Sequence, residues 1–427
     1  MTWKNSGRAR EGRPAALTVG LFGGLGSGNI GNDASLEAML SYLRTDHPEA
    51  VLDAMCGGPD LVRARYGIPA RSIHWAPGHQ SARGLQRLAV KALRKPVDAV
   101  RIAGWVRRHD VVIVPGMGIL ETGLPVRPWQ FPYLLFVLSV AGRVFRTRVA
   151  LVSVGANVIN QWMTRWLLCR AARLACYRSY RDALSREAMR QMGQDVTADH
   201  VFTDLAFALP AVSAEPGDPR TVGVGVMDYY GSNDESRRHA AQRHATYVAA
   251  LQDFVLWLVD SGRRVRLFVG DTNGSDDRVL QSILAGLQEA RPGLGAAQVT
   301  AEPVRSYGDL MRAMAPASTV VATRYHNVIC ALKLGKPTIS ISYAQKNTAL
   351  MTAMGLSAFC QDIGALDGAA LIGQLNELER QAPQLRTAIA RYNAELERAI
   401  AAQFAELTAV LFPVAGRRPA RRRLAGR

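Results

Sequence analysis

Short apolar segments rich in β-branched residues alternate with longer, helix-like stretches along the whole chain. The segments expected to form buried strands are residues 17–22, 111–114, 149–154, 222–227, 265–269, 319–323 and 338–342. Continuous apolar runs of this length suit strands that are buried on both faces, as in parallel sheets covered by helices. The pattern therefore predicts an α/β protein with helices on both faces of its sheets.

A break in composition near the middle of the chain predicts two domains. Residues 210–220 hold a cluster of proline, glycine and aspartate between two strand-like segments, TDLAFAL and TVGVGVM. Such clusters mark linkers between domains. We expect two doubly wound, Rossmann-like domains facing each other, at residues 17–210 and 221–370. A C-terminal helix at 371–412 would return toward the first domain, between a basic, disordered N-terminus (1–16) and an arginine-rich tail (413–427).

Charge and hydropathy exclude several classes of protein. The chain has 427 residues, a formal net charge of +17 and 48% hydrophobic residues, so it can bury a large core. No apolar run reaches the ~20 residues that a membrane-spanning helix needs, and residues 17–22 are too short for a signal peptide. We therefore expect a cytoplasmic protein. The five cysteines include no CxxC pair, so the sequence predicts neither a disulfide framework nor a zinc site.

Basic residues are concentrated between residues 83 and 108. This segment contains eight basic residues and one acid, Asp98, interleaved with apolar residues at helical spacing. Basic amphipathic helices bind polyanions, among them phospholipid head groups, nucleic acid and anionic glycans. No RNA-reading motif accompanies the segment, so we expect no specific nucleic acid. The segment is either a solvated face or a surface that attaches the protein peripherally to the inner face of the cytoplasmic membrane.

The loop after the first expected strand is rich in glycine. Its sequence, GGLGSGNIGND, contains a GxGxxG at Gly26, Gly28 and Gly31 that resembles a dinucleotide fingerprint. That fingerprint begins tightly after its strand and leads straight into a helix, whereas residues 23–25 intervene here. A nicotinamide-dependent dehydrogenase is therefore the third-ranked functional hypothesis. Asp33 either takes part in chemistry or only caps the helix that follows.

A second loop, PGMGILETG at residues 115–123, follows another expected strand. Gly116 and Gly118 would let a ligand approach the backbone closely. Glu121 in the same loop is either a ligand for a hydroxyl or an exposed acid.

Basic side chains follow two expected strands of the second half. Arg324 ends one strand, His326 lies two residues on at the start of a helix, and Lys346 follows the next strand. Basic side chains at helix N-termini favour a small polyanion, because side-chain charge, free amide donors and the helix dipole act together.

Taken together, these segments resemble the polysaccharide pyruvyl transferase family. The matching motifs run in order from Val19 to Leu356: GNIGND, VPGMGIL, YRDALSREAMRQMG, TDLAFAL and TRYHNVICALKLGKPTISISYAQKN. The resemblance implies a fold similar to that of GT-B glycosyltransferases. It also implies transfer of pyruvate from phosphoenolpyruvate, as a ketal, onto a sugar of a cell-surface polysaccharide or its lipid-linked precursor. It implies no further cofactor and no metal.

Residue by residue, the resemblance implies two sets of contacts. The phosphoenolpyruvate contacts would be Arg181, Arg324 and His326, with Lys346 nearby. The acceptor side would hold Asn29, Asn32, Asp33, Gly116, Gly118 and Glu121. The sequence departs from the family at two places: Asn32 stands where the family usually has an aspartate, and SVGANVIN lacks the usual Gly-x-Gly.

The chemistry of such a transfer suggests roles for three of these residues. Arginine forks bind the carboxylate and phosphate of phosphoenolpyruvate, which suits Arg324. The reaction also needs a proton donor and an acceptor for a hydroxyl proton, for which His326 and Asp33 are the candidates. His326 could instead only bind phosphate. The alternative function is a GT-B glycosyltransferase with a nucleotide-sugar donor, which usually holds the ribose through a late glutamate, whereas residues 343–350 contain a lysine and no acid.

Overall fold

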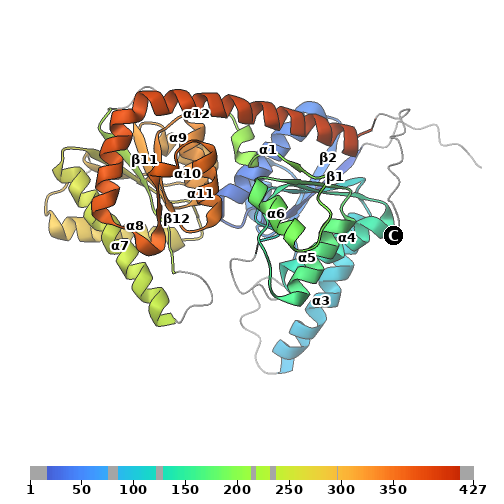
Figure 1. Cartoon of the computed structure of the whole chain (residues 1–427). Coiled ribbons are helices and arrows are strands. Elements are labelled where there is room, and N and C mark those ends of the chain that lie inside the picture. The colour runs from blue at the N-terminus through green and yellow to red at the C-terminus, as the bar shows by residue number, and fades with distance from the viewer. Residues whose placement is uncertain are drawn as a thin grey trace, which may run out of the picture.

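The computed structural model describes residues 17–75, 85–121, 128–212, 218–230, 237–295 and 297–413. The basic segments predicted at residues 1–16 and 413–427 lie outside these ranges, apart from Pro413. The described residues form two parallel sheets flanked by helices, joined along one side by a long C-terminal helix (Figure 1).

The first sheet has seven parallel strands in the order β3-β2-β1-β4-β5-β6-β7. They are β1 Thr18–Gly23, β2 Val51–Cys56, β3 Ala70–Ser72, β4 Val111–Pro115, β5 Arg148–Val154, β6 Tyr177–Tyr180 and β7 His200–Val201. Its helices are α1 Ile30–Asp46, α2 Pro59–Tyr66, α3 Leu85–Val106, α4 Phe131–Phe145, α5 Trp162–Leu174 and α6 Ala183–Gln191. Every residue of β4 is buried, as expected for a central strand covered on both faces.

The second sheet has six parallel strands in the order β10-β9-β8-β11-β12-β13. They are β8 Thr221–Gly225, β9 Arg264–Phe268, β10 Val299–Ala301, β11 Thr319–Ala322, β12 Thr338–Ser342 and β13 Cys360–Asp362. Its helices are α7 Arg237–Asp260, α8 Ser275–Ala290, α9 Tyr307–Met314, α10 Tyr325–Lys333 and α11 Gln345–Ala353. Strand order reverses at β1/β4 and at β8/β11, and ligands of such sheets bind beyond the carboxyl ends of the strands at these points. The predicted fold class, two doubly wound Rossmann-like sheets, is confirmed.

The last helix, α12 (Gly368–Leu411), contacts both domains. It starts against the second domain and ends on the first, where the Phe404 ring stacks on Tyr42 with 4.4 Å between ring centroids. The Gln403 side chain is fully buried there and hydrogen-bonds to the hydroxyls of Ser153, at the end of β5, and Ser179 in β6. These contacts make the end of the chain part of the first domain's core.

The segment TDLAFAL, expected to be a strand, is not one. Leu205–Ala208 form a short 3-10 helix, η1, whose first turn is capped by Asp204, since its Oδ1 accepts a hydrogen bond from the Ala206 N–H at 3.0 Å. Helix η1 packs between α1, α10 and α12. An apolar run of this length cannot distinguish a strand from a buried helical turn, and here the aspartate cap favours the turn.

Within the basic segment at residues 83–108, Leu85–Val106 form α3, whose first turns extend beyond the body of the domain (Figure 1). Its single acid, Asp98, is fully buried and accepts a hydrogen bond from the Trp75 N–H at 2.7 Å. The carboxylate also lies within 4.0 Å of Arg94 and Arg101. Among the described residues, no helix is long and apolar enough to cross a bilayer.

Candidate functional site

Loops at the carboxyl ends of both sheets meet across the boundary between the domains. The Thr272 N–H, beyond β9, donates to the Gly28 carbonyl at 2.7 Å, and the neighbouring residues Asn29 and Asp271 form an isolated antiparallel bridge. A second contact joins the domains, since Lys333 Nζ donates to the Phe207 carbonyl at 2.7 Å. The residues that follow the strands of each domain are thereby brought into one site.

Five charged or titratable side chains form an interdomain charge cluster: Glu121, Arg181 and Asp204 from the first domain, His326 and Lys346 from the second. Arg181 follows β6 directly and pairs with Glu121 and with Asp204, whose Oδ2 lies 3.4 Å from Nη1. Lys346 Nζ donates to Glu121 Oε2 at 3.0 Å. His326 Nε2 lies 3.7 Å from Asp204 Oδ2. Each carboxylate thus links a basic group of one domain to a basic group of the other.

The cluster keeps its two linking carboxylates ionised. Burial alone would raise the pKa of Asp204, but the nearby His326 and the charge of Arg181 lower it to about 2. Burial opposes ionisation of Glu121 as well, and the charges of Arg181 and Lys346 lower its pKa to about 2. Opposite charge close to a buried carboxyl outweighs desolvation in both cases.

An aromatic ring supports the cations of the cluster. Tyr325 is buried at the start of α10, and its ring centroid lies 5.0 Å from the Arg181 guanidinium carbon and 5.4 Å from Lys346 Nζ. The Tyr343 ring lies 5.6 Å from the same Nζ. Cation–π contacts of this kind hold a charged group in place without neutralising it.

Two glycines are required by the close packing of the cluster. A Cβ at Gly31, in the first turn of α1, would collide with the His326 ring. A Cβ at Gly155, after β5, would collide with Glu121 and Arg181. Gly31 is the third glycine of the apparent dinucleotide fingerprint, so its missing side chain makes room for His326 of the other domain. Gly155 is the single glycine of SVGANVIN.

Arg324 lies next to the cluster and is held by two acids. Its Nε and Nη2 donate to the two carboxylate oxygens of Asp276 at 2.5 and 2.6 Å, and its Nη1 lies 3.7 Å from Asp271 Oδ2. Asp276 is fully buried in the first turn of α8 and also accepts from the backbone N–H groups of Asp228 and Gly270, at 2.9 and 3.2 Å. Two parallel bonds fix the plane of the guanidinium and leave Nη1 free of Asp276.

The predicted acceptor residues of the first loop bond within that loop. The Asn29 side chain caps α1 by accepting from the N–H groups of Gly31 and Asn32. Asn32 Nδ2 donates to the Gly24 carbonyl at 3.2 Å. Asp33 is 4% exposed and accepts from the Gly26 N–H at 2.6 Å. Burial raises the pKa of Asp33 above its ordinary value, although that hydrogen bond opposes the shift.

Neighbouring side chains also occupy the space beside both glycines of the second loop. A Cβ at Gly116 would collide with the Ser35 side chain of α1, and one at Gly118 would collide with the Glu121 carboxylate. These glycines therefore bring the loop against α1 and around Glu121. Glu121 itself, predicted on the acceptor side, contacts Lys346 of the phosphoenolpyruvate side.

Sequence reasoning missed Asp204 and Asp276 as site residues. Asp204 was noted only within an expected strand, and Asp276 looks like an ordinary acid at a helix start. The signal available for both is their position directly after a strand and its loop, at the edge where ligands of such sheets bind.

A family model for polysaccharide pyruvyl transferases matches residues 29–345, most of the chain. The chain belongs to the polysaccharide pyruvyl transferase family. The matched segment contains all of the interdomain charge cluster except Lys346, which is the next residue after it, and it contains Arg324 and Asp276. Family membership supports a transferase. No curated protein matches the chain.

The fold is also that of several solved structures. UDP-GlcNAc 2-epimerase from Methanocaldococcus jannaschii has a TM-score of 0.56 and 8% identity, over 84% of this chain and 92% of that one. The Neisseria meningitidis epimerase bound to UDP-GlcNAc has a TM-score of 0.54 and 12% identity, over 92% and 99%. Anabaena Alr3699/HepE in complex with UDP has a TM-score of 0.54 and 12% identity, over 92% and 100%. At these identities the likeness shows the GT-B-like fold and not the reaction.

No metal centre is formed by the residues that the structure describes: none of their His, Cys, Asp and Glu side chains form a group of three suited to a metal ion. All five cysteines are unpaired.

Replacing Asp204 by asparagine should reduce the acid sensitivity of the fold. Because the pKa of Asp204 is lower in the folded chain than in the unfolded one, its ionised form stabilises the fold above its ordinary pKa. That contribution, about 2 kcal/mol, disappears as the pH falls from about 5 toward 2. Urea unfolding between pH 7 and pH 3 should therefore show a smaller loss of unfolding free energy in Asp204→Asn than in the wild type. Asp253→Asn, an exposed change on α7, is the control and should match the wild type.

Proposed function

We propose that the protein transfers pyruvate from phosphoenolpyruvate onto two hydroxyls of a sugar, forming a ketal on a cell-surface polysaccharide or its lipid-linked precursor. The observation that carries this proposal is the convergence of Arg181, Arg324, His326 and Lys346 at the carboxyl ends of facing sheets. Phosphoenolpyruvate carries a carboxylate and a phosphate, and arginine forks with a lysine point charge match those two groups. Membership of the pyruvyl transferase family supports the same reaction.

The position of Glu121 supports binding of a small carboxylate. Its two oxygens lie between Arg181 and Lys346. A substrate carboxylate entering this place would replace Glu121 on the same two cations, and the displaced Glu121 side chain, which is 21% exposed, would turn toward solvent.

His326 and Asp33 are the proposed groups for proton transfer. Protonation of the methylene carbon of phosphoenolpyruvate makes the adjacent carbon electrophilic. One sugar hydroxyl then adds to that carbon and gives its proton to Asp33, which passes it to the phosphate as the phosphate leaves with the C–O bond electrons. The second hydroxyl adds to the same carbon and closes the ketal, and its proton restores the one that His326 donated. In the first role we consider, His326, whose Nε2 lies 3.7 Å from Asp204 Oδ2, supplies the first proton as an imidazolium. In the other role we consider, the same imidazolium only binds the phosphate.

A nucleotide-sugar glycosyltransferase is the second candidate. It is favoured by the fold shared with UDP-GlcNAc 2-epimerases and with a protein solved in complex with UDP. It would predict binding of a UDP-sugar in place of phosphoenolpyruvate, so ligand binding separates the two functions.

Arg324→Lys should weaken binding of phosphoenolpyruvate about 10- to 100-fold, because a hydrogen bond to a charged group is worth about 1.5 to 3 kcal/mol. Lysine keeps a positive charge beside the buried Asp276, so the fold should survive, but the Nη1 donor that Asp276 leaves free is lost. Thermal-shift titration of both proteins measures the two affinities. Arg312→Lys, an exposed arginine on α9, should behave as the wild type does. Stabilisation of the wild type by NAD or a UDP-sugar, with none by phosphoenolpyruvate, would remove the proposal.

His326→Gln separates the two roles of His326. If His326 donates the proton, turnover should fall by a factor of about 100 or more while KM changes little. If it only binds phosphate, kcat and KM should change together. Phosphate release from phosphoenolpyruvate in the presence of a glycan acceptor measures both constants. A kcat/KM equal to that of the wild type would exclude both roles.

We also propose that α3 attaches the protein peripherally to the inner face of the cytoplasmic membrane, where a lipid-linked acceptor would be found. Each basic residue near an anionic surface contributes about 1 kcal/mol, so binding should be reversed by salt. Co-sedimentation with phosphatidylglycerol vesicles should be strong for the wild type and largely lost when Arg87, Lys91, Arg94 and Lys95 are changed to Gln. Equal binding to neutral phosphatidylcholine vesicles would make α3 a solvated face.

A further inference from the structure

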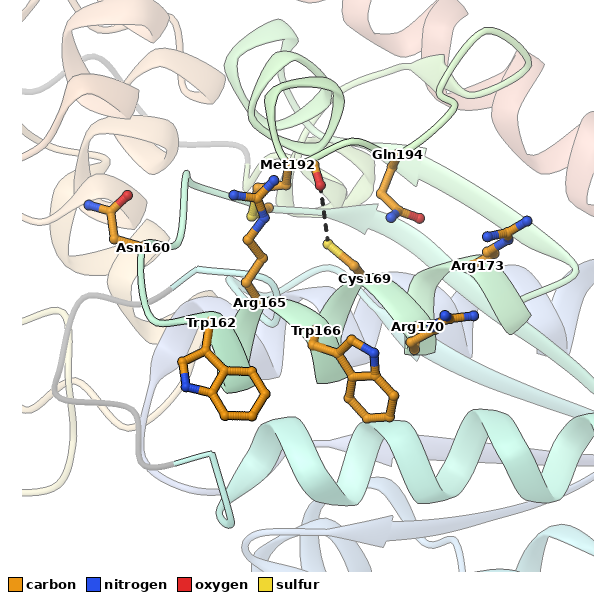
Figure 2. A pocket seen from close by; sticks show the side chains of 9 residues that line it. All are labelled: Asn160, Trp162, Arg165, Trp166, Cys169, Arg170, Arg173, Met192 and Gln194. Atoms are coloured by element: carbon orange, nitrogen blue, oxygen red, sulfur yellow. Dashed lines mark hydrogen bonds between the residues drawn. The ribbon is translucent and has the colours of Figure 1, made fainter.

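A hollow of about 450 Å³ lies on the first domain, between α5 and the end of α6 (Figure 2). We call it the α5 hollow. Its lining includes two indoles and three arginines of α5, with one amide from the preceding loop: Trp162, Trp166, Arg165, Arg170, Arg173 and Asn160. Its volume lies within the range of about 300 to 1,000 Å³ typical of small-molecule sites.

The arginines of the α5 hollow lack acidic partners. Residues 122–181 contain nine arginines and no Asp or Glu. Arg178 and Arg181 of this stretch pair with Asp199 and Glu121. By contrast, no carboxylate among the described residues forms an ion pair with the three arginines of the hollow. Uncompensated arginines gathered around a concave site attract a polyanion and bind carboxylate or phosphate groups by paired hydrogen bonds.

The two indoles give the α5 hollow an apolar edge. Trp162 and Trp166 lie side by side one helical turn apart (Figure 2), and they are 73% and 47% exposed. Trp166 is held between the Phe136 ring, at 5.4 Å, and Arg170, whose guanidinium carbon lies 5.9 Å from the indole centroid. An exposed indole combines a flat apolar face with an N–H donor. That combination suits a sugar ring, which has an apolar C–H face and hydroxyls at its edge.

One end of the α5 hollow lies close in sequence to the candidate site. Asn160 follows Gly155 by five residues, and Gly155 lies against Glu121 and Arg181. Helix α5 then leads from this loop toward Arg173. The loop of residues 156–160 therefore connects the interdomain charge cluster to the lining of the hollow.

We infer that the α5 hollow binds an acidic stretch of glycan, the part of the acceptor chain that continues beyond the sugar receiving pyruvate. This inference rests on the proposed function. The concave shape and the amides of Asn160 and Gln194 favour a discrete ligand with hydroxyls over a flat lipid surface. The arginines select acidic chains, and the indoles bind sugar rings.

The test is calorimetric titration with tetragalacturonate and with its fully methyl-esterified form, which has the same rings without charge. The wild type should bind the acid and bind the ester at least tenfold more weakly. Arg170→Gln with Arg173→Gln should weaken binding of the acid at least tenfold. The control, Arg391→Gln with Arg398→Gln, removes the same charge from two exposed positions of α12 and should bind as the wild type does.

A second variant tests the indole separately from the charge. Trp162→Ala should weaken binding of the acid several-fold and leave the preference for acid over ester unchanged. Because Trp162 is mostly exposed, this change should not alter the melting temperature. Unchanged affinity in Trp162→Ala would contradict a role in binding sugar rings.

Phosphoenolpyruvate titration of the same proteins keeps this inference separate from the proposed function. Both arginine double variants should bind phosphoenolpyruvate as the wild type does. If the wild type binds tetragalacturonate through Arg170 and Arg173 but does not bind phosphoenolpyruvate, glycan binding in the hollow is supported and the proposed reaction is contradicted. Absence of tetragalacturonate binding, equal binding of acid and ester, or unchanged binding in the hollow variant overturns the inference. So does binding of phosphatidylglycerol vesicles through these arginines without binding of the glycan.

Discussion

The site depends on the need to neutralise one buried arginine. The Arg181 side chain is 2% exposed at the meeting point of the domains, where an unpaired charge would be prohibitively costly. Glu121 and Asp204 of the first domain pair with this arginine. Each of these carboxylates also contacts a basic group of the second domain: Glu121 contacts Lys346, and Asp204 contacts His326. Pairing one cation therefore places the basic groups of both domains around a common point. Moving the domains apart would break carboxylate links on both sides at once.

Much of the fold was predictable because its signal is local. Buried parallel strands read as short apolar runs, and residues that end them must lie at the edge where ligands bind. Arg324, His326 and Lys346 were identified in this way, whereas Arg181 was predicted only from the resemblance to the family. Contacts between distant segments were not predictable: nothing near Gly31 in sequence shows that it accommodates His326, and nothing near Arg324 shows that Asp276 fixes it from 48 residues away. The strand expected at TDLAFAL failed for a related reason, since burial alone does not specify secondary structure.

The likeness to UDP-GlcNAc 2-epimerases shows how little the framework says about the reaction. The same pair of sheets brings strand ends together in each of these proteins, and the residues placed there decide which ligand is bound. In this chain those residues form a compact set of opposite charges with few free donors. Such a set suits a small, doubly anionic substrate that can exchange with a resident carboxylate. The uncompensated arginines along α5 have a different character, because they remain open to solvent and to a longer chain.

The path of α12 has a consequence for the order in which the protein can assemble during synthesis. Gln403 and Phe404 complete a region of the first domain formed by Tyr42, Ser153 and Ser179, yet they are among the last described residues to be made. A nascent first domain emerging from the ribosome would have this region uncovered until α12 has been made. Completion of its core is thus tied to synthesis of the second domain, and a ribosome that stalls before Gln403 would leave the first domain without these contacts.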